Sequence, residues 1–328
     1  MSKVAYIGRV QSVNAIPDAD RIESLEVVCG PGGKWRGTAV KGSFSEGDVC
    51  EVYLQDALLL PSERYGFMEK HHWRVRMMRL RGVPSECLIM PVTEITDGLV
   101  VGTDIADVYG VTKYEKPIPA QIAGDIAGNF PSFIPKTDEP NFQTAPHLVE
   151  ALVGNEYYIT VKADGSSGTA YWHEGSLHCC SRNWELKDNP STAVWILARK
   201  YNLHRLSEIS QYAIQFEIVG PRVQGNAMGL NEIDMRVFNV YDKEEQEYAR
   251  WEDVISVCKF LGVPTVSIAQ SGYCFPLYSD DELRKLAEVR YENGAHAEGI
   301  VVRPVESIRV NGERVSFKVI NLLYKERD

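Results

Sequence analysis

The stretch that decides the fold is Tyr158-Ile-Thr-Val-Lys162-Ala-Asp-Gly165-Ser-Ser-Gly-Thr169, in which an apolar, β-rich run delivers one lysine to a tight turn. Lysine is depleted in buried strands, so this lysine either lies on an exposed edge or has a chemical task. The simpler interpretation is a strand that enters a hairpin turn at Asp164-Gly165. The alternative is a nucleophile, because a lysine becomes strongly nucleophilic when burial or a nearby cation lowers its pKa. The rest of the chain has to decide between them.

The composition is that of a soluble globular protein. The chain has 328 residues, enough for two domains, and no apolar run approaches the length of a membrane-spanning helix. Arg9 interrupts the apolar N-terminal residues early, so we expect neither a secretory signal nor an association with a membrane. The seven cysteines form no Cys-x-x-Cys pair and no zinc-ligand spacing. Small buried thiols in a reducing compartment are the simplest interpretation, and we expect a cytoplasmic protein.

The net charge of −10 argues against binding a polyanion by bulk charge. It does not exclude a local basic groove, and part of the acidic surplus can belong to metal-binding carboxylates. The distribution of charge therefore matters more than its sum.

The first third of the chain predicts a small β-barrel. Short β-rich runs separated by Gly- and Pro-containing turns indicate a barrel or sandwich, and five strands in about a hundred residues fit an OB-type barrel. We assign residues 1–110 to this domain. The clearest runs are 4–10, 21–29, 35–40 and 49–54.

A basic stretch, residues 70–82, lies within the predicted barrel. Read as a strand, it places two arginines on one face and two more on one face after an irregularity at Met77-Met78. One interpretation is a solvated edge strand protected by charge. The other is a series of phosphate contacts beside Trp73, as expected of a nucleic-acid-binding barrel. The four arginines are Arg74, Arg76, Arg79 and Arg81.

Residues 111–145 form a Pro-containing linker, either a domain connector or a lid over a site. The second domain, 146–328, alternates strands and amphipathic helices. A short helix is expected at 145–153 and a hairpin around His173-Glu-Gly-Ser176. Longer helices are expected at 191–202, 251–261 and 280–291, and strands at 212–220, 236–242, 298–303 and 315–320.

Four strands of this domain carry a charged residue inside an apolar run. Each has a simple explanation on its own, such as an edge strand, but together they supply two cations and two anions. Two carboxylates can hold a divalent cation, and two lysines can serve as nucleophile and phosphate clamp. The reaction that uses all four is attack of a lysine on the α-phosphate of a metal-bound nucleoside triphosphate. The four residues are Lys162, Glu217, Glu298 and Lys318.

The order of short motifs resembles that of the covalent nucleotidyltransferases, the superfamily of DNA ligases, RNA ligases and mRNA capping enzymes. The closest resemblance is to ATP-dependent RNA ligases with an N-terminal OB domain, RNA ligase family 5. The motifs are Lys162-Ala-Asp-Gly165, Ser181-Arg-Asn183, Phe216-Glu-Ile-Val-Gly-Pro221, Phe238-Asn-Val-Tyr-Asp242, Glu298-Gly-Ile-Val-Val-Arg303 and Ser316-Phe-Lys318.

The resemblance implies an α+β protein, with the OB-like barrel followed by an ATP-grasp-like ligase domain of antiparallel sheets flanked by helices. It implies that Lys162 attacks ATP and becomes lysyl-AMP, with Mg²⁺ or Mn²⁺ held by Glu298 and Glu217. AMP then passes to an RNA 5′-phosphate, and a 3′-OH attacks to seal the ends. Lys318 contacts the α-phosphate as a catalytic residue. The nucleotide-binding set is Arg182, Glu217, Phe238, Lys318, Thr160 and Val161, with Glu217 on the ribose and Phe238 on the adenine.

The chain departs from the family pattern at several positions, among them Phe216 and Cys87, each of which stands where a glycine is expected. Ser167 stands where another RNA ligase branch has an asparagine that handles the 3′-OH end, so we include it among the nucleic-acid contacts. Relatives carry two lysines separated by one residue in the last motif, whereas the next lysine after Lys318 is Lys325.

We expect a monomer acting on RNA with 3′-OH and 5′-phosphate ends, such as a nicked duplex in repair. The alternatives within enzymes are a DNA ligase and a capping-type guanylyltransferase, and the absence of a C-terminal OB domain counts against both. The alternative outside enzymes is a non-catalytic tRNA- or RNA-binding protein with a lapsed transferase domain. The intact set of two lysines and two glutamates argues against it.

Overall fold

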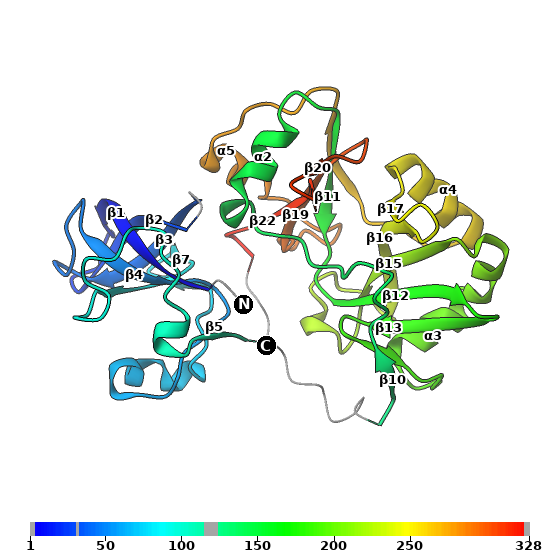
Figure 1. Ribbon diagram of the computed structural model, residues 1–328, viewed down its shortest axis with the longest axis horizontal. Coiled ribbons are helices and arrows are strands. Elements are labelled where there is room, and N and C mark those ends of the chain that lie inside the picture. The colour runs from blue at the N-terminus through cyan, green and yellow to red at the C-terminus, as the bar shows by residue number, and fades with distance from the viewer. Residues whose placement is uncertain (1–3, 31–32, 115–123, 325–328) are drawn as a thin grey trace. The chain divides into compact units, whose positions relative to one another are not determined.

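The computed structural model describes residues 4–30, 33–114 and 124–324. The chain divides into two compact units (Figure 1). The first contains the described residues up to 114 together with 142–146, and the second contains 124–141 and 147–324. Residues 124–141, which the sequence assigns to a linker, thus belong structurally to the second unit.

The first unit is a five-stranded antiparallel barrel with the strand order β3-β2-β1-β4-β8. Inward and outward residues alternate, and in β2 every second residue from Glu23 to Cys29 is buried. A parallel bridge between Gly37 and Cys87 joins the two outer parts of the sheet, as expected of a barrel. The predicted OB-like barrel is confirmed. Its strands are β1 (Ala5–Ala15), β2 (Ile22–Cys29), β3 (Gly33–Val40), β4 (Val49–Tyr53) and β8 (Leu88–Pro91).

Shorter elements surround this barrel. They are η1 (Glu63–His71), η2 (Asp107–Tyr109), η3 (Phe142–Thr144) and the strand pairs β5 (Ala57–Leu58) with β9 (Thr112–Lys113) and β6 (Met78–Leu80) with β7 (Val83–Ser85).

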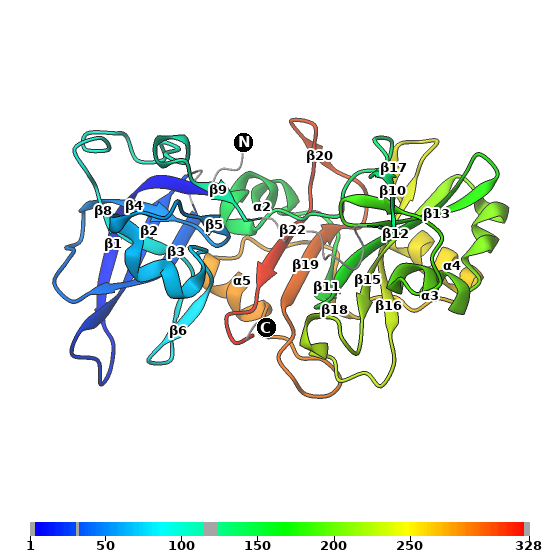
Figure 2. The same cartoon turned by 90° about the horizontal axis from the view of Figure 1, so that it is seen from below.

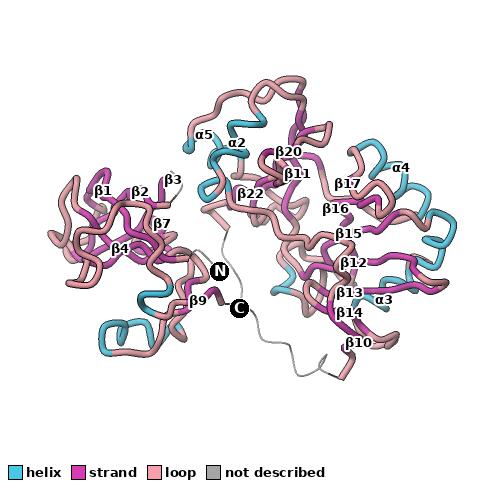
Figure 3. The backbone as a smooth tube through the Cα atoms, in the orientation of Figure 1, coloured by secondary structure: helices cyan, strands magenta, loops and turns pink. Residues whose placement is uncertain are grey.

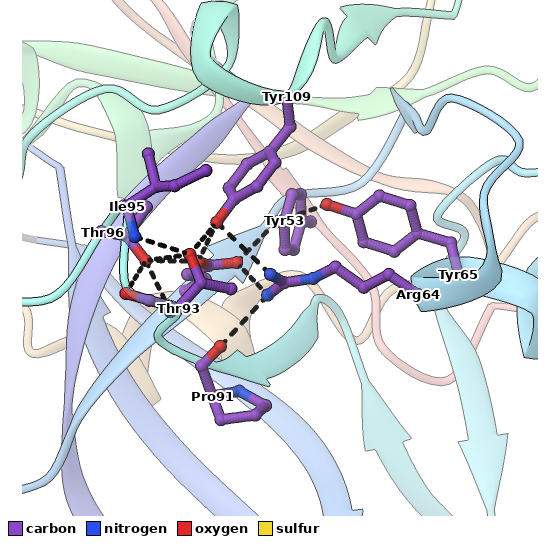
Figure 4. A network of polar contacts seen from close by, with 9 residues as sticks. Tyr53, Arg64, Tyr65, Pro91, Thr93, Ile95, Thr96 and Tyr109 are labelled. Carbon is purple, nitrogen blue, oxygen red and sulfur yellow. Dashed lines mark hydrogen bonds and ion pairs between the residues drawn. The ribbon is translucent and has the colours of Figure 1, made fainter.

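A fully buried carboxylate, Glu51 on β4, holds several of these elements together. Figure 4 shows Tyr53, Arg64, Thr96 and Tyr109 turned toward one point, and each donates to a Glu51 carboxylate oxygen at 2.5 to 2.7 Å. A buried charge is tolerated only when it is paired and its lone pairs are bonded, which is the case here. The network joins β4 to η1 and η2 and so stabilises the barrel.

The basic stretch 70–82 is not the single strand that the sequence predicts. The His72 N–H donates to the Glu69 carbonyl, and the backbone of His72 and Trp73 turns through left-handed angles, with φ of 50° and 62°. The residues between this helix end and the start of β6 at Met78, which include Arg74 and Arg76, form no regular strand. The prediction of a strand face shared by these two arginines is therefore wrong.

Strand structure begins only at β6. The hairpin from β6 to β7 turns at Arg81-Gly82, whose φ values of 52° and 83° are those of a type I′ turn. Arg81 is exposed at the tip of this hairpin, and Arg79, which is partly buried, donates to the Gly82 carbonyl at 3.0 Å.

The second unit contains two larger antiparallel sheets, with strand orders β10-β14-β13-β12-β15-β16-β17 and β18-β11-β19-β22. The strands of the first sheet are β10 (Ile126–Asn129), β12 (Ser166–His173), β13 (Ser176–Ser181), β14 (Trp184–Leu186), β15 (Tyr212–Val219), β16 (Asp234–Asp242) and β17 (Glu247–Tyr248). Those of the second sheet are β11 (Tyr157–Lys162), β18 (Ile268–Gly272), β19 (Gly299–Pro304) and β22 (Phe317–Ile320). A small pair, β20 (Arg309–Val310) and β21 (Glu313–Arg314), precedes β22.

Helices cover the seven-stranded sheet (Figure 3). Apolar residues of α3, η4 and α4 form one core with the strands, because each helix presents an apolar stripe to the sheet. The antiparallel sheets flanked by helices confirm the predicted α+β class. The helical segments of this unit are α2 (Pro146–Leu152), α3 (Ala193–Lys200), η4 (Leu203–Ile209), η5 (Gln224–Asn226), α4 (Trp251–Leu261) and α5 (Asp280–Leu286).

The last helix is shorter than the sequence predicts. The periodicity favours 280–291, whereas α5 ends at Leu286. Tyr291 instead closes a turn in which its N–H donates to the Ala295 carbonyl at 2.9 Å.

The strand that ends at Lys162 does not enter a hairpin. β11 pairs with β18 and β19, whereas the next strand, β12, pairs with β13 and β15. The chain therefore passes from one sheet to the other at Ala163-Asp-Gly165. A Cβ at Gly165 would lie 2.1 Å from the Ile218 carbonyl oxygen, so only glycine fits this passage.

Candidate active site

The lysine of the deciding stretch lies at the end of β11, opposite the start of β19. Lys162 is the last paired residue of β11 and faces Gly299 of β19. Its Nζ is 2.6 Å from Oε2 of Glu298, and about a quarter of each side chain is exposed (25% and 22%). In Figure 2, β11, β19 and β22 lie beside one another, as their pairing requires. The structure thus brings two of the four predicted charged residues into direct contact.

Glu217 on β15 interacts electrostatically with both residues of this ion pair. Burial raises the pKa of Glu217 to about 8, with repulsion from Glu298 and Asp164 adding to the effect of burial and attraction to Lys162 opposing it. For Lys162, burial acts to lower the pKa, but the carboxylates of Glu298 and Glu217 outweigh it and hold the pKa above its ordinary value. Lys162 is therefore an ammonium ion at neutral pH in the protein alone.

Asp164 is a site residue to which the sequence analysis gave no role. Its carboxylate accepts from the Tyr324 hydroxyl at 2.5 Å, and its charge acts on both Lys162 and Glu217. The signal was present, because Asp164 is part of the Lys-x-Asp-Gly motif.

Lys318 lies on β22, which pairs with β19 on the side away from β11. Its Cα partner is Val301, its side chain is partly buried, and its backbone N–H donates to the Pro140 carbonyl at 2.8 Å. Lys325, the next lysine, lies outside the described residues. The assignment of Lys318 to the α-phosphate stays a prediction.

The residues predicted to hold the nucleotide differ in how far their side chains are buried. Phe238 on β16 is partly buried and packs against a small cluster that contains Ala163, the residue after Lys162. Val161 is also partly buried. Thr160, in contrast, is 1% exposed, and its hydroxyl accepts from Arg303 at 3.3 Å. Their roles toward a nucleotide stay predictions.

A segment from the predicted linker, residues 135–140, runs along the site residues, and we call it the 135–140 segment. Four consecutive residues of it bond to four different strands or loops of the unit. The bonds are Thr137 Oγ1 to Ser167 Oγ (2.6 Å), Asp138 to Arg182 (2.6 Å), Glu139 to Arg303 (2.9 Å) and the Pro140 carbonyl to the Lys318 N–H (2.8 Å).

The Glu139–Arg303 pair is the buried member of this set. Arg303 is 1% exposed, and burial, which raises the pKa of Glu139, is outweighed by Arg303 and Arg314, so that the pKa lies below its ordinary value. The Asp138–Arg182 pair is half exposed (56% and 53%). Sequence reasoning noted the charges of this segment but not their partners, because the partners are distant in sequence.

The predicted nucleic-acid contacts are not equivalent. Arg74 is 8% exposed and donates twice to Asp56, at 2.9 and 2.6 Å, with its guanidinium over the Tyr114 ring. Its charge is thus already committed to an ion pair. Ser167 bonds to the 135–140 segment, as described above. The other three arginines lie on the stretch 76–81 and stay predictions.

The acidic residues suit a hard divalent cation. Glu298 and Glu217 offer carboxylate oxygens, the donors that Mg²⁺ and Mn²⁺ prefer. In residues 4–30, 33–114 and 124–324, no three His, Cys, Asp or Glu side chains are gathered as a complete metal site. The same described residues contain no helix long and apolar enough to cross a membrane.

The second unit thus carries an ion-paired lysine at a sheet junction, two glutamates and an aromatic ring. Comparison with known proteins defines the family. The RNA ligase family model matches residues 155–320, and an OB-fold domain model matches residues 4–92. The chain therefore belongs to the RNA ligase family and carries an N-terminal OB-fold domain. No curated protein matches the chain.

Solved structures of Naegleria gruberi RNA ligase are similar over nearly the whole chain. The structure with PPi is 29% identical with a TM-score of 0.80, and the match covers 98% of this chain and 97% of that one. A mutant with ATP and Mn is 29% identical with a TM-score of 0.81 and coverage of 97% of both chains. A mutant with AMP and Mn is 29% identical with a TM-score of 0.81, and the match covers 98% of this chain and 97% of that one.

Proposed function

We propose that this RNA ligase uses ATP and a divalent cation to join RNA 3′-OH and 5′-phosphate ends, with Lys162 as the nucleophile. The observation that carries the proposal is the Lys162–Glu298 contact of 2.6 Å at the junction of two sheets. Solved structures of the Naegleria gruberi enzyme with ATP, AMP, PPi and Mn support the choice of nucleotide and metal.

The first step is transfer of AMP to Lys162. The neutral amine attacks the α-phosphorus, a P–N bond forms, and the bond to pyrophosphate breaks. Because Lys162 starts as an ammonium ion, it must first lose a proton, and the ion pair with Glu298 opposes this loss. A cation bound to Glu298 and Glu217 would supply positive charge that favours the neutral amine and the developing phosphate charge.

The later steps use the same site. The RNA 5′-phosphate attacks the lysyl phosphoramidate, the P–N bond breaks, and a pyrophosphate link to AMP forms. The 3′-OH then attacks the 5′-phosphorus, AMP leaves and the phosphodiester is complete. Lys318 and Arg182 offer the positive charge that phosphate groups need in such transfers. Phe238 offers a flat face for the adenine.

The substrate that we propose is a nicked duplex, sealed by a monomer in the cytoplasm. Arg81 at the exposed tip of the hairpin and Arg79 and Arg76 before it supply local positive charge on a chain whose net charge is −10. Local clusters of this kind position phosphates without a basic protein overall.

A sealing assay tests the proposal. Labelled nicked duplexes that vary the sugar at each end are incubated with ATP or GTP and Mg²⁺ or Mn²⁺. We expect joining with ATP when the 3′-OH strand is RNA. Joining of all-DNA nicks alone would favour a DNA ligase, and activity with GTP alone would favour a capping-type enzyme. No joining and no covalent nucleotide would favour a non-catalytic RNA-binding protein.

A further inference from the structure

One uncharged side chain joins the two segments that carry Lys162 and Glu298. The Tyr291 hydroxyl donates to the Lys162 carbonyl oxygen at 2.9 Å. It accepts from the Asp164 N–H at 2.9 Å and from the Glu298 N–H at 3.3 Å. A tyrosine hydroxyl has one donor and two acceptor positions, so these three bonds use its full capacity.

This hydroxyl lies where two neighbouring strands separate. The last pair between β11 and β19 is Lys162 with Gly299, and the chain then leaves toward the other sheet. Buried backbone N–H and C=O groups just beyond the last paired residues of two strands need other hydrogen-bond partners. The Tyr291 hydroxyl supplies them and thereby fixes the backbone on both sides of the ion pair.

Tyr291 itself is held firmly. It is 6% exposed, and its ring packs with Ala227, Ala297 and Tyr324. Its N–H donates to the Ala295 carbonyl, and its carbonyl accepts from the Gly294 N–H, both at 2.9 Å. Burial raises the pKa of Tyr291 well above its usual range, so the hydroxyl keeps its proton and stays a donor.

We propose that Tyr291 is a positioning residue, which sets the Lys162 amine against Glu298 and aims it for attack on the nucleotide. The proposal rests on the role of Lys162 as nucleophile. A backbone shift of about 1 Å at a nucleophile can cost about 100-fold in rate, so three bonds at this point are worth testing.

The variant Tyr291→Phe removes the hydroxyl and keeps the ring. We expect the rate of lysine adenylylation at saturating ATP to fall about 10- to 100-fold, with the KM for ATP unchanged. Sealing of RNA that already carries AMP does not use the Lys162 amine, so we expect it to fall much less. The control is Tyr171→Phe, which removes the hydroxyl of another buried tyrosine, bonded to Glu185 at 3.3 Å in the other sheet.

Both variants are assayed well below their melting temperatures, so that unfolding does not contribute to the measured rates of adenylylation and sealing. Equal adenylylation rates for Tyr291→Phe and Tyr171→Phe would overturn the positioning role. So would a loss that appears only as a higher KM, or one that is equal in adenylylation and sealing. Failure of the wild-type protein to form any adduct would instead overturn the proposed function, and the two failures are thus distinct.

Discussion

The buried pair of Glu139 and Arg303 makes the stability of the second unit depend on a segment that the sequence describes as a linker. The perturbation is Glu139→Gln, which removes the charge and keeps the shape. Arg303 is 1% exposed and its guanidinium lies 2.9 Å from Oε1 of Glu139. Breaking a buried pair by removing one partner costs about 3–5 kcal/mol, because the other charge stays buried without compensation.

This cost corresponds to a large shift in melting temperature. For a unit of about 200 residues, each kcal/mol lowers the melting temperature by about 2–4 °C, so we expect a decrease of about 6–20 °C. The matched control is Asp138→Asn, one residue earlier, whose ion pair with Arg182 is half exposed. An exposed pair contributes about 0–1 kcal/mol, so this variant should melt within about 4 °C of the wild type.

The pH dependence has a defined sign. The pKa of Glu139 lies below its ordinary value, so the stabilisation is present above the unfolded pKa of about 4.3 and is lost as pH falls through the lower folded value. The difference between wild type and Glu139→Gln should therefore be full at pH 7 and shrink at acid pH. The assay is thermal or urea unfolding at pH 7 and below pH 4. Equal stabilities of Glu139→Gln and Asp138→Asn at pH 7 would refute the reasoning.

Three further predictions concern other groups. Burial raises the pKa of Glu217 to about 8, whereas the unfolded value is about 4.3, so between these pH values Glu217 takes up a proton on folding. The stability of the wild-type protein should therefore fall as pH rises from about 5 to 8. Glu217→Gln should flatten this pH dependence in thermal unfolding, and an unchanged slope would contradict the raised pKa of Glu217. Glu51→Gln should lower the free energy of unfolding of the barrel by about 3 kcal/mol, seen as faster hydrogen exchange in β4, whereas unaltered exchange would mean that the network adds no stability. Reversing the charges of Arg79 and Arg81 should weaken nick sealing more than lysine adenylylation, and equal losses would exclude the hairpin as a nucleic-acid contact.

The sequence predicted what is local. The barrel strands, the hairpin around Gly175 and the helix at 251–261 follow from residues close together in the chain, and each formed as expected. The two parts predicted wrongly, the strand at 74–77 and the end of the helix at 280–291, depend on how a helix terminates. Histidine is one of the residue types that adopt left-handed angles more often than most, but such angles are rare for a bulky residue, so nothing in the sequence predicts them at Trp73.

The site required contacts that span long distances in sequence. Lys162 and Glu298 were both named, but their contact joins residues 136 positions apart, which no periodicity reveals. The sequence also left open whether the strand before Lys162 enters a hairpin. The strand pairing excludes a hairpin, because β11 and β12 belong to different sheets and the chain crosses between them at Gly165. Tyr291 gave no signal, since the sequence places it at the end of a predicted helix, where it is one of the apolar positions of the periodic pattern.

The 135–140 segment shows the same limit. Its prolines predicted an extended connection, and its charges left a connector and a lid as alternatives. The structure shows it bonded to β12, β19 and β22 through successive residues, so it is part of the unit that carries the site.

The central claim is that Lys162 is the nucleophile, and covalent labelling tests it most directly. Wild-type protein is incubated with α-labelled ATP and Mg²⁺ or Mn²⁺, denatured in detergent at alkaline pH, digested and mapped by mass spectrometry. We predict an AMP adduct on the peptide that contains Lys162, stable in alkali and released by acid as expected of a P–N bond. We also predict its absence from Lys162→Ala and its release when pyrophosphate is added before denaturation. No adduct on the wild-type protein, or an equal adduct on Lys162→Ala, would contradict the claim.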